Sequence, residues 1–200
     1  TNYMRSSLWT TGCTDDTACV ARNHGARVVQ ENRRGYGSAC LKGISELDGP
    51  EIVVFVDGDY SDYPEELEKL VQPIREGEVD FVLGSRMILL ESRCALLPQA
   101  RYGNKLAVFL INLFFGHQFT DLGPFRAIRY ESLKNIGMRD TNFGWTVEMQ
   151  IKAVKHGLRI REIPVRYRER IGVSKITGTV AGTIRAGTKI VYTIFKYLVV

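Results

Sequence analysis

The sequence predicts an α/β fold in which a mixed, mostly parallel sheet is flanked by helices. Two observations predict this fold. Residues 51–67, EIVVFVDGDYSDYPEEL, join a continuous apolar run to a helix start, and helix-like and strand-like segments alternate through the first half of the chain. A strand that is apolar at every position is buried on both faces, as strands in parallel sheets usually are. We therefore expect βαβ units with right-handed crossovers.

The first elements follow from caps and periodicity. Residues 13–25 have a threonine cap, acids in the first turn and a terminal glycine, so they predict a helix. Residues 26–30 predict a strand. A loop punctuated by glycines then enters a helix in which the apolar residues recur near helical spacing, at Ala39, Leu41, Ile44 and Leu47.

The remaining elements alternate less regularly. We expect a strand over 52–56, a helix over 64–76 that starts at Pro64, and a strand over 80–84. The apolar segment Leu96–Phe115 predicts a helix whose apolar side chains are either buried in the protein or in contact with a partner. The last segments predict a strand, a helix, an alternating strand and a basic amphipathic helix, at 125–129, 144–157, 158–169 and about 179–198.

Composition sets broad limits on the class of protein. The chain has 200 residues, of which 44% are hydrophobic and 24% charged, so we expect one globular domain over residues 1–200. No apolar stretch has the length of a transmembrane helix, and we expect a cytoplasmic protein that is peripheral to the membrane. The four cysteines and three histidines have no metal-binding spacing, and we assign them no role.

Basic residues are concentrated at the C-terminal end. Residues 151–200 contain eleven Lys and Arg residues but only two acids, Glu162 and Glu169, whereas the whole chain has a net charge of +5. Such an end favours an anionic partner, and nucleic acid, membrane headgroups and a polyphosphate substrate all qualify, as does a solvated basic face. We see no nucleic-acid module and expect no nucleic-acid partner. The last helix either packs on the core or lies at an anionic membrane surface.

Asp57 and Asp59 lie on the loop between a predicted buried strand and the following helix. Ligands bind outside the carboxyl ends of strands in open α/β sheets, and side chains at i and i+2 of an extended segment point the same way. Two carboxylates suit Mg²⁺ or Mn²⁺, which are commonly held together with substrate phosphates. The alternative is that Asp57, Gly58 and Asp59 simply form a turn.

Six segments together resemble one family. They occur in the order found in family 2 glycosyltransferases of the dolichyl-phosphate mannose or glucose synthase type, and the resemblance extends from about Thr14 to the C-terminal part of the chain. The segments are NRRGYGSACLKGI, VVFVDGDYSDYPEEL, DFVLGSR, TDLGPFRAIR, FGWTVEMQIKA and RIGVSKITG. The resemblance implies a GT-A fold, a nucleotide diphosphate sugar donor, Mg²⁺ or Mn²⁺, and inverting transfer to a lipid-linked phosphate or another acceptor.

The resemblance also implies roles for individual residues. Asp59 is similar to the principal metal ligand of the Asp-x-Asp motif, and Asp57 would lie nearer the ribose and the metal. Residues that would clamp donor or acceptor phosphate are Arg86, Arg126, Arg170, Ser174 and Lys175.

Each role has a structural alternative. The arginines also suit surface ion pairs, and the 170–175 segment also suits a strand cap. Asp121 and Glu148 are the candidate carboxylate bases for a hydroxyl acceptor. Asp121 also suits holding a loop, and Glu148 also suits the solvated face of a helix.

The N-terminal segment departs from the family pattern. TNYMRSSLWTTGCTDD shows neither the usual first strand nor an acid before Gly12. We therefore expect an N-terminally truncated fold, or a partner chain or second copy that supplies the exposed sheet edge, because an unpaired edge favours association.

Three functions remain open from the sequence. The leading hypothesis is a metal-dependent, inverting glycosyltransferase that moves a hexose from a nucleotide diphosphate sugar to a polyprenyl phosphate at an anionic membrane surface. The first alternative keeps the donor but uses a sugar or protein hydroxyl as acceptor. The second is a truncated, non-catalytic module that binds nucleotide sugars.

Overall fold

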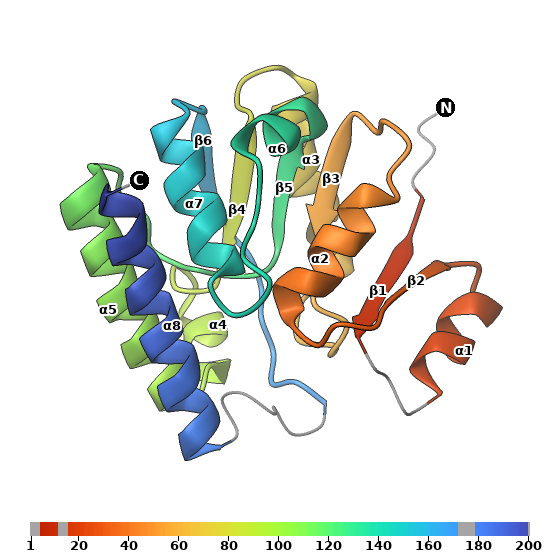
Figure 1. Ribbon diagram of the computed structural model, residues 1–200, viewed down its shortest axis with the longest axis horizontal. Helices are drawn as coiled ribbons and strands as arrows, with labels where there is room; N and C mark the ends of the chain where they lie inside the picture. The colour runs from red at the N-terminus through yellow and green to blue at the C-terminus, as the bar shows by residue number, and fades with distance from the viewer. Residues whose placement is uncertain (1–4, 12–15, 172–178, 200) are drawn as a thin grey trace.

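The computed structural model describes residues 5–11, 16–171 and 179–199. Helices and strands alternate along this part of the chain (Figure 1). The elements in chain order are β1 (Ser7–Thr11), α1 (Thr17–Asn23), β2 (Arg27–Glu31), α2 (Tyr36–Ser45), β3 (Ile52–Phe55), the 3-10 helix η1 (Pro64–Glu66), α3 (Leu67–Arg75), β4 (Phe81–Ser85), α4 (Leu90–Ala95), α5 (Pro98–Phe115), β5 (Arg126–Arg129), α6 (Tyr130–Ile136), α7 (Trp145–Lys155), β6 (Ile160–Pro164) and α8 (Val180–Val199).

The strands of the described residues form two sheets. The larger sheet has the order β3-β5-β4-β6, and the smaller pairs β1 with β2 in parallel. Strand β5 is antiparallel to both neighbours, whereas β4 and β6 are parallel. Strands β3, β4 and β6 therefore share one direction and β5 opposes them. The predicted mixed, mostly parallel sheet between helices is confirmed.

Helices cover both faces of the larger sheet. Helices α2, α6 and α7 lie in front of it in Figure 1, and α3 lies behind. Strand β4 is buried throughout and alternates between the two sides, since Phe81 and Leu83 belong to one apolar cluster and Val82 to the other. Burying each of these side chains contributes about 1.5–3 kcal/mol. The apolar run that predicted this strand is thus explained by burial on both faces.

Strand β1 corrects the sequence prediction, because a strand forms ahead of Gly12 where none was expected. Its two apolar residues gave too short a pattern, yet Trp9 packs edge-to-face on Phe55 with ring centroids 5.5 Å apart. A Cβ atom placed on Gly43 of α2 would lie 2.0 Å from the Trp9 ring. Close packing of Trp9 against α2 and β3 therefore fixes β1.

Three other features differ from the sequence predictions. Helices α4 and α6 were not predicted, because six or seven residues give little periodicity. The alternating strand predicted over 158–169 ends at Pro164. Beyond it, residues 166–171 leave the sheet and run beside the loop that follows β3.

No helix in the described part of the chain is both long and apolar enough to span a bilayer.

We predict that Gly43→Ala destabilises the fold by about 1–3 kcal/mol, because the added methyl group overpacks the contact with Trp9. Gly103→Ala in α5 is the matched control, since a Cβ atom there meets nothing within 4 Å. The control should raise stability by about 0.5–1 kcal/mol through helix propensity. Urea unfolding of the two variants measures both effects, and equal stabilities would contradict this packing of β1.

Candidate functional site

The loop that follows β3 carries the acidic residues and is joined to residues 166–171. The amide N–H of Ile171 donates to the carbonyl oxygen of Asp59 at 3.1 Å, and an antiparallel bridge joins Asp62 to Tyr167. The loop lies outside the carboxyl end of β3, which is where ligands bind in open α/β sheets. Two segments far apart in sequence therefore form one wall of the candidate site.

Asp59 is paired with a cation from the second segment. Its Oδ2 forms an ion pair with Arg170, which lies 111 residues further along the chain. Its Oδ1 accepts hydrogen bonds from the Ser61 hydroxyl and from the Ser61 amide N–H, the latter at 3.0 Å. The Asp59 side chain keeps 20% of its surface exposed. This carboxylate is thus oriented by Ser61, neutralised by Arg170 and still reachable from solvent.

Asp57 lies at the centre of several charges. Burial raises the pKa of its carboxyl group, and the nearby Asp59 raises it further. Three arginines, Arg86, Arg170 and Arg126, act in the opposite direction and lower this pKa. The structure therefore brings the two aspartates and three of the predicted phosphate-binding residues into one electrostatic neighbourhood.

Asp62 is a third carboxyl group of the loop and was not predicted as a site residue. Its Oδ2 accepts a hydrogen bond from the amide N–H of Asp57 at 3.2 Å, and its side chain is buried. Its Oδ1 is buried without a hydrogen-bond partner. Burial, followed by the charge of Asp57, raises the pKa of Asp62 to about 7. The short spacing from Asp57 was the only sequence signal.

Arg168 and Tyr60 complete the wall and were also not predicted. Tyr60 has φ +68°, a conformation that is uncommon for residues other than glycine. The Arg168 guanidinium donates to the Tyr60 carbonyl oxygen, and its central carbon lies 3.3 Å from the Tyr60 ring centroid. The hydrogen bond and the cation–π contact stabilise the strained turn between Asp59 and Ser61.

Arg86 and Asp121 form a buried bidentate pair. The Nε and Nη2 groups of Arg86 each donate to an Asp121 oxygen at 2.8 Å, and the Arg86 amide N–H donates at 2.9 Å. Asp121 is fully buried, and the Arg86 side chain is 13% exposed. Since both oxygens of Asp121 are engaged, this carboxylate fixes the loop before β5 and orients Arg86. It is not free to accept a proton from a bound hydroxyl.

Arg126 is buried in the core, and its charge acts on Asp57. Its guanidinium donates to the carbonyl oxygens of Leu122, Gly123 and Thr146. Burial lowers the pKa of Arg126 to about 10. With its donors directed at backbone carbonyls, Arg126 supplies positive charge near Asp57 without presenting a free fork to a ligand.

Glu148 joins three parts of the structure. One oxygen accepts hydrogen bonds from the Tyr197 hydroxyl at 2.6 Å and the Arg139 amide N–H at 3.0 Å, and it pairs with Lys152 at 2.7 Å. The other oxygen accepts from the Asp140 amide N–H at 2.6 Å. The side chain is fully buried. Glu148 thus ties α8 and the loop before α7 to α7, in contrast to the solvated helix face weighed from the sequence.

Two predicted phosphate-binding residues, Ser174 and Lys175, lie outside the described residues. The described chain stops at Ile171, directly after the Arg170–Asp59 pair, and resumes at Thr179.

The donor set fits a divalent cation only in part. No group of three or more His, Cys, Asp or Glu side chains in the described ranges is arranged to hold a metal ion. Asp57 and Asp59 nevertheless present hard carboxylate oxygens on one loop, next to arginines suited to phosphate. This arrangement fits an ion that takes one or two carboxylates and completes its coordination with substrate phosphates.

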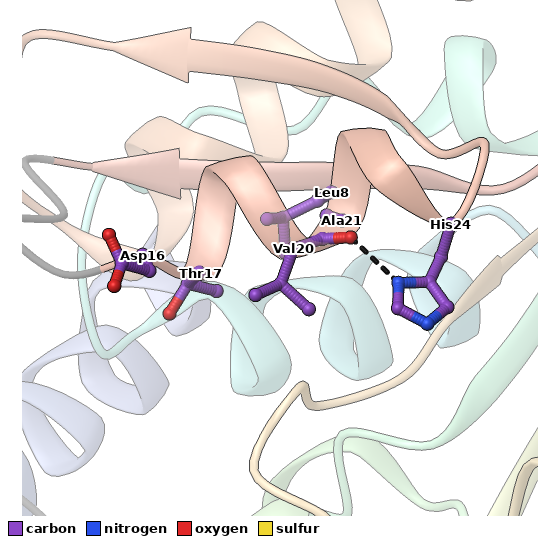
Figure 2. Close-up of a pocket in the computed structure, with 6 residues that line it drawn as sticks. All are labelled: Leu8, Asp16, Thr17, Val20, Ala21 and His24. Carbon is purple, nitrogen blue, oxygen red and sulfur yellow. Dashed lines mark hydrogen bonds between the residues drawn. The ribbon is translucent and has the colours of Figure 1, made fainter.

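An apolar hollow lies elsewhere, between β1 and α1. It has a volume of about 580 Å³, and Figure 2 shows Leu8, Val20 and His24 among the residues around it. The His24 ring is held by a 2.9 Å contact between its Nδ1 atom and the Val20 carbonyl oxygen. None of the site aspartates lines this hollow, so it is separate from the acidic loop.

We predict that Asp62 makes stability fall as pH rises. Its pKa is raised in the folded state from the usual 3.8 to about 7, so its contribution is complete below about pH 4 and is lost as pH passes about 7. Asp62→Asn should keep the hydrogen bond from Asp57 and gain about 1 kcal/mol or more on wild type between these limits. Urea unfolding in EDTA measures this, with exposed Asp48→Asn as control. Parallel pH profiles for wild type and Asp62→Asn would contradict the assignment.

Comparisons with known proteins agree with the fold. The model of the family described as "Glycosyl transferase family 2" matches residues 11–137. An uncharacterized glycosyltransferase of Mycobacterium tuberculosis is 36% identical over 174 residues, which cover 86% of this chain and 78% of the relative. A dolichyl-phosphate hexose transferase of Haloferax volcanii is 34% identical over 170 residues, which cover 82% of this chain and 71% of the relative.

Solved structures show the same fold. Glucosyl-3-phosphoglycerate synthase of Mycobacterium tuberculosis, in complex with phosphoglyceric acid, superposes with a TM-score of 0.71 at 21% identity. The match covers 94% of this chain and 69% of that one. The same enzyme with Mn²⁺, UDP-glucose and phosphoglyceric acid gives a TM-score of 0.68 at 20% identity, over 92% of this chain and 66% of that one. The expected GT-A fold is confirmed, and the chain belongs to glycosyl transferase family 2.

Proposed function

We propose that the protein transfers a hexose, with inversion, from a nucleotide diphosphate sugar to a polyprenyl phosphate. The observation that carries the choice of acceptor is the state of the two candidate bases. Asp121 and Glu148 are both fully buried, and both oxygens of each accept hydrogen bonds or ion pairs. A hydroxyl acceptor needs a base to take its proton, whereas a phosphate oxygen is already ionised near neutral pH. The engaged carboxylates therefore favour the phosphate.

Asp59 and Asp57 are the proposed ligands of Mg²⁺ or Mn²⁺. The ion would neutralise negative charge on the departing nucleoside diphosphate. Asp59 is the better placed of the two, since Ser61 orients one oxygen while Arg170 holds the other. Arg170 is the cation that the donor phosphates would draw away from Asp59. An arginine held beside the carboxylate is preorganised for this exchange.

Arg86 is the proposed second phosphate contact. Asp121 fixes its guanidinium, which lies 5.0 Å from the ring centroid of Tyr167 on the segment facing the acidic loop. Arg126 contributes positive charge near Asp57 from its buried position in the core. Ser174 and Lys175 remain proposed phosphate ligands on the strength of the family resemblance.

Relatives support the donor and divide on the acceptor. One relative is named a dolichyl-phosphate hexose transferase, and a structural neighbour holds Mn²⁺ and UDP-glucose. That neighbour also holds phosphoglyceric acid, which carries both a phosphate and a hydroxyl group. A hydroxyl acceptor is therefore the second candidate. A non-catalytic module is less favoured, because the described carboxylates and arginines of the site lie together.

The basic α8 helix is the proposed link to an anionic membrane surface. It contains no acid and carries Arg185, Lys196 and Lys189, of which Lys189 is paired with Asp140 at 2.8 Å. Each well-placed cation near such a surface contributes about 1 kcal/mol. Removing α8 would be a poor test, because Ile194 and Tyr197 are buried and Tyr197 bonds to Glu148.

We predict that Asp59→Asn weakens Mn²⁺-dependent binding of a nucleoside diphosphate about tenfold or more, because a metal ligand loses its charge. Asp57→Asn should weaken this binding less, since Asp57 shares the role of metal ligand with Asp59. Isothermal titration with UDP and with GDP, each with and without Mn²⁺, measures the effect, and exposed Asp48→Asn is the control. Unchanged Mn²⁺-dependent affinity in Asp59→Asn would exclude Asp59 as a ligand.

We also predict an order among the charged residues in a transfer assay with polyprenyl phosphate. Arg170→Ala and Lys175→Ala should each lower turnover by about 100-fold or more, because the phosphate nucleophile needs cations to orient it. Asp121→Asn breaks a buried pair and should cost about 3–5 kcal/mol of stability. Turnover per folded molecule should fall less than in Arg170→Ala or Lys175→Ala, because the variant loosens Arg86 but removes no cation. Circular dichroism gives the folded fraction. A steep loss per folded molecule in Asp121→Asn with a tolerant Lys175→Ala would favour the hydroxyl acceptor.

A further inference from the structure

The loop between α6 and α7 docks against the N-terminal end of α2. Figure 1 shows this α6–α7 loop, residues 137–144, running from α6 to the first turn of α2. The amide N–H and the hydroxyl group of Ser38 both donate to the Thr141 carbonyl oxygen, at 2.9 and 3.2 Å. Two of the six segments that resemble the family, NRRGYGSACLKGI and FGWTVEMQIKA, are therefore held together through this loop.

Two glycines make this close contact possible. A Cβ atom placed on Gly37 would lie 2.0 Å from the Asp140 carbonyl oxygen, and one placed on Gly35 would lie 2.2 Å from that of Thr141. Gly35 also has φ +145°, a conformation that residues with a side chain rarely adopt. Both distances are far shorter than a van der Waals contact. The backbone of α2 therefore approaches the α6–α7 loop to a distance that only glycine allows.

Asp140 organises the α6–α7 loop from within. Its Oδ1 accepts hydrogen bonds from the amide N–H groups of Asn142 at 2.8 Å and Gly144 at 3.2 Å. An aspartate side chain that bonds to backbone N–H groups just after it in the chain fixes a turn. The amide N–H of Asp140 itself donates to Glu148 of α7 at 2.6 Å. This carboxylate therefore fixes the turn whose carbonyl groups meet α2.

Helix α8 holds the other oxygen of Asp140. The Nζ atom of Lys189 lies 2.8 Å from Oδ2, and the Asp140 side chain is only 9% exposed. A hydrogen bond between two charged groups is about twice as strong as one between neutral groups. Gly144 lets α8 come close, since a Cβ atom there would lie 2.5 Å both from Asp140 Oδ2 and from Thr193 Oγ1. The α6–α7 loop is therefore held between α8 on one side and α2 on the other (Figure 1).

The elements that the α6–α7 loop joins meet next to Asp57. Tyr36, in the first turn of α2, packs against the core. Burial raises the pKa of its hydroxyl group, and the charge of Asp57 raises this pKa further. At the start of α7, Trp145 packs edge-to-face on Phe55, two residues before Asp57, with ring centroids 6.2 Å apart. The position of the loop therefore affects two of the side chains that surround the proposed donor site.

We propose that Asp140 is a positioning residue for the donor site and that Lys189 of α8 holds it in its working orientation. Asp140 keeps the α6–α7 loop in the turn against which α2 docks, and α2 in turn keeps Tyr36 beside Asp57. A displacement of about 1 Å in a site can cost about 100-fold in rate, so a residue that acts through α2 can affect the donor without contacting it. The inference rests on the proposed binding of a nucleotide diphosphate sugar at Asp57 and Asp59.

The test measures nucleotide affinity and amide exchange in Lys189→Met and Asp140→Asn. Isothermal titration with UDP and with GDP, each with Mn²⁺, should show affinity weakened about fivefold or more in both variants, because the loop and the donor site are coupled. Lys189→Arg keeps the charge and should bind more tightly than Lys189→Met. By NMR, the Ser38 amide should exchange faster in Lys189→Met, since its acceptor on the loop is less fixed. Lys134→Met breaks an exposed ion pair on α6, 2.7 Å long, and is the control that should match wild type.

Urea unfolding gives the folded fraction, so that affinities are compared per folded molecule, and Lys189→Met decides alone if Asp140→Asn is unfolded. Coupling is reciprocal, so the nucleoside diphosphate with Mn²⁺ should also slow Ser38 exchange in wild type. Wild-type affinity in folded Lys189→Met, or unchanged Ser38 exchange in that variant, would overturn the inference and leave a purely structural ion pair. A wild type that binds neither nucleotide in the presence of Mn²⁺ would instead overturn the proposed function, and this inference with it.

Discussion

Repulsion among three carboxyl groups is the constraint on which the candidate site depends. Asp57, Asp59 and Asp62 lie within one short loop, and burial together with their mutual charge raises the pKa of Asp57 and of Asp62. Such a loop persists only where cations compensate it. The chain supplies them from separate segments: Arg170 pairs with Asp59 directly, and Arg86 and Arg126 act on Asp57.

This compensation explains two features of the chain that lie far apart in the sequence. Residues 166–171 leave the sheet after Pro164 and hydrogen-bond to the loop. This course places Arg168 and Arg170 beside the loop, where their positive charge offsets that of the carboxylates. Asp121 in turn fixes Arg86, so a buried acid serves the site by orienting a cation. A divalent cation would bring positive charge to Asp59, and a nucleoside diphosphate would bring negative charge to Arg170. The charges of the site thus balance one another within the chain, and a bound cation and phosphate can take the place of these internal partners.

Patterns local in sequence were predictable, and contacts distant in sequence were not. The buried strands β3 and β4, the helix after Pro64 and the Asp57–Asp59 pair follow from apolar runs, caps and spacing, and the structure contains these elements. Strand β1 depends on the packing of Trp9 against Gly43 and Phe55, which no local pattern encodes. The Arg170–Asp59 pair joins residues 111 positions apart. The roles of Glu148 and Asp121 likewise depend on their burial. The sequence alone does not show whether a carboxylate faces solvent or three hydrogen-bond donors.

We propose that Asp59 exchanges Arg170 for a divalent cation and leaves the arginine to the donor phosphates. Anomalous diffraction at the manganese edge, from crystals of the protein grown with Mn²⁺ and a nucleoside diphosphate, would show this exchange. We expect a manganese peak about 2.1 Å from an Asp59 oxygen, with the Arg170 guanidinium moved onto the diphosphate. A nucleoside diphosphate bound while Arg170 still pairs with Asp59, with manganese elsewhere or absent, would contradict it.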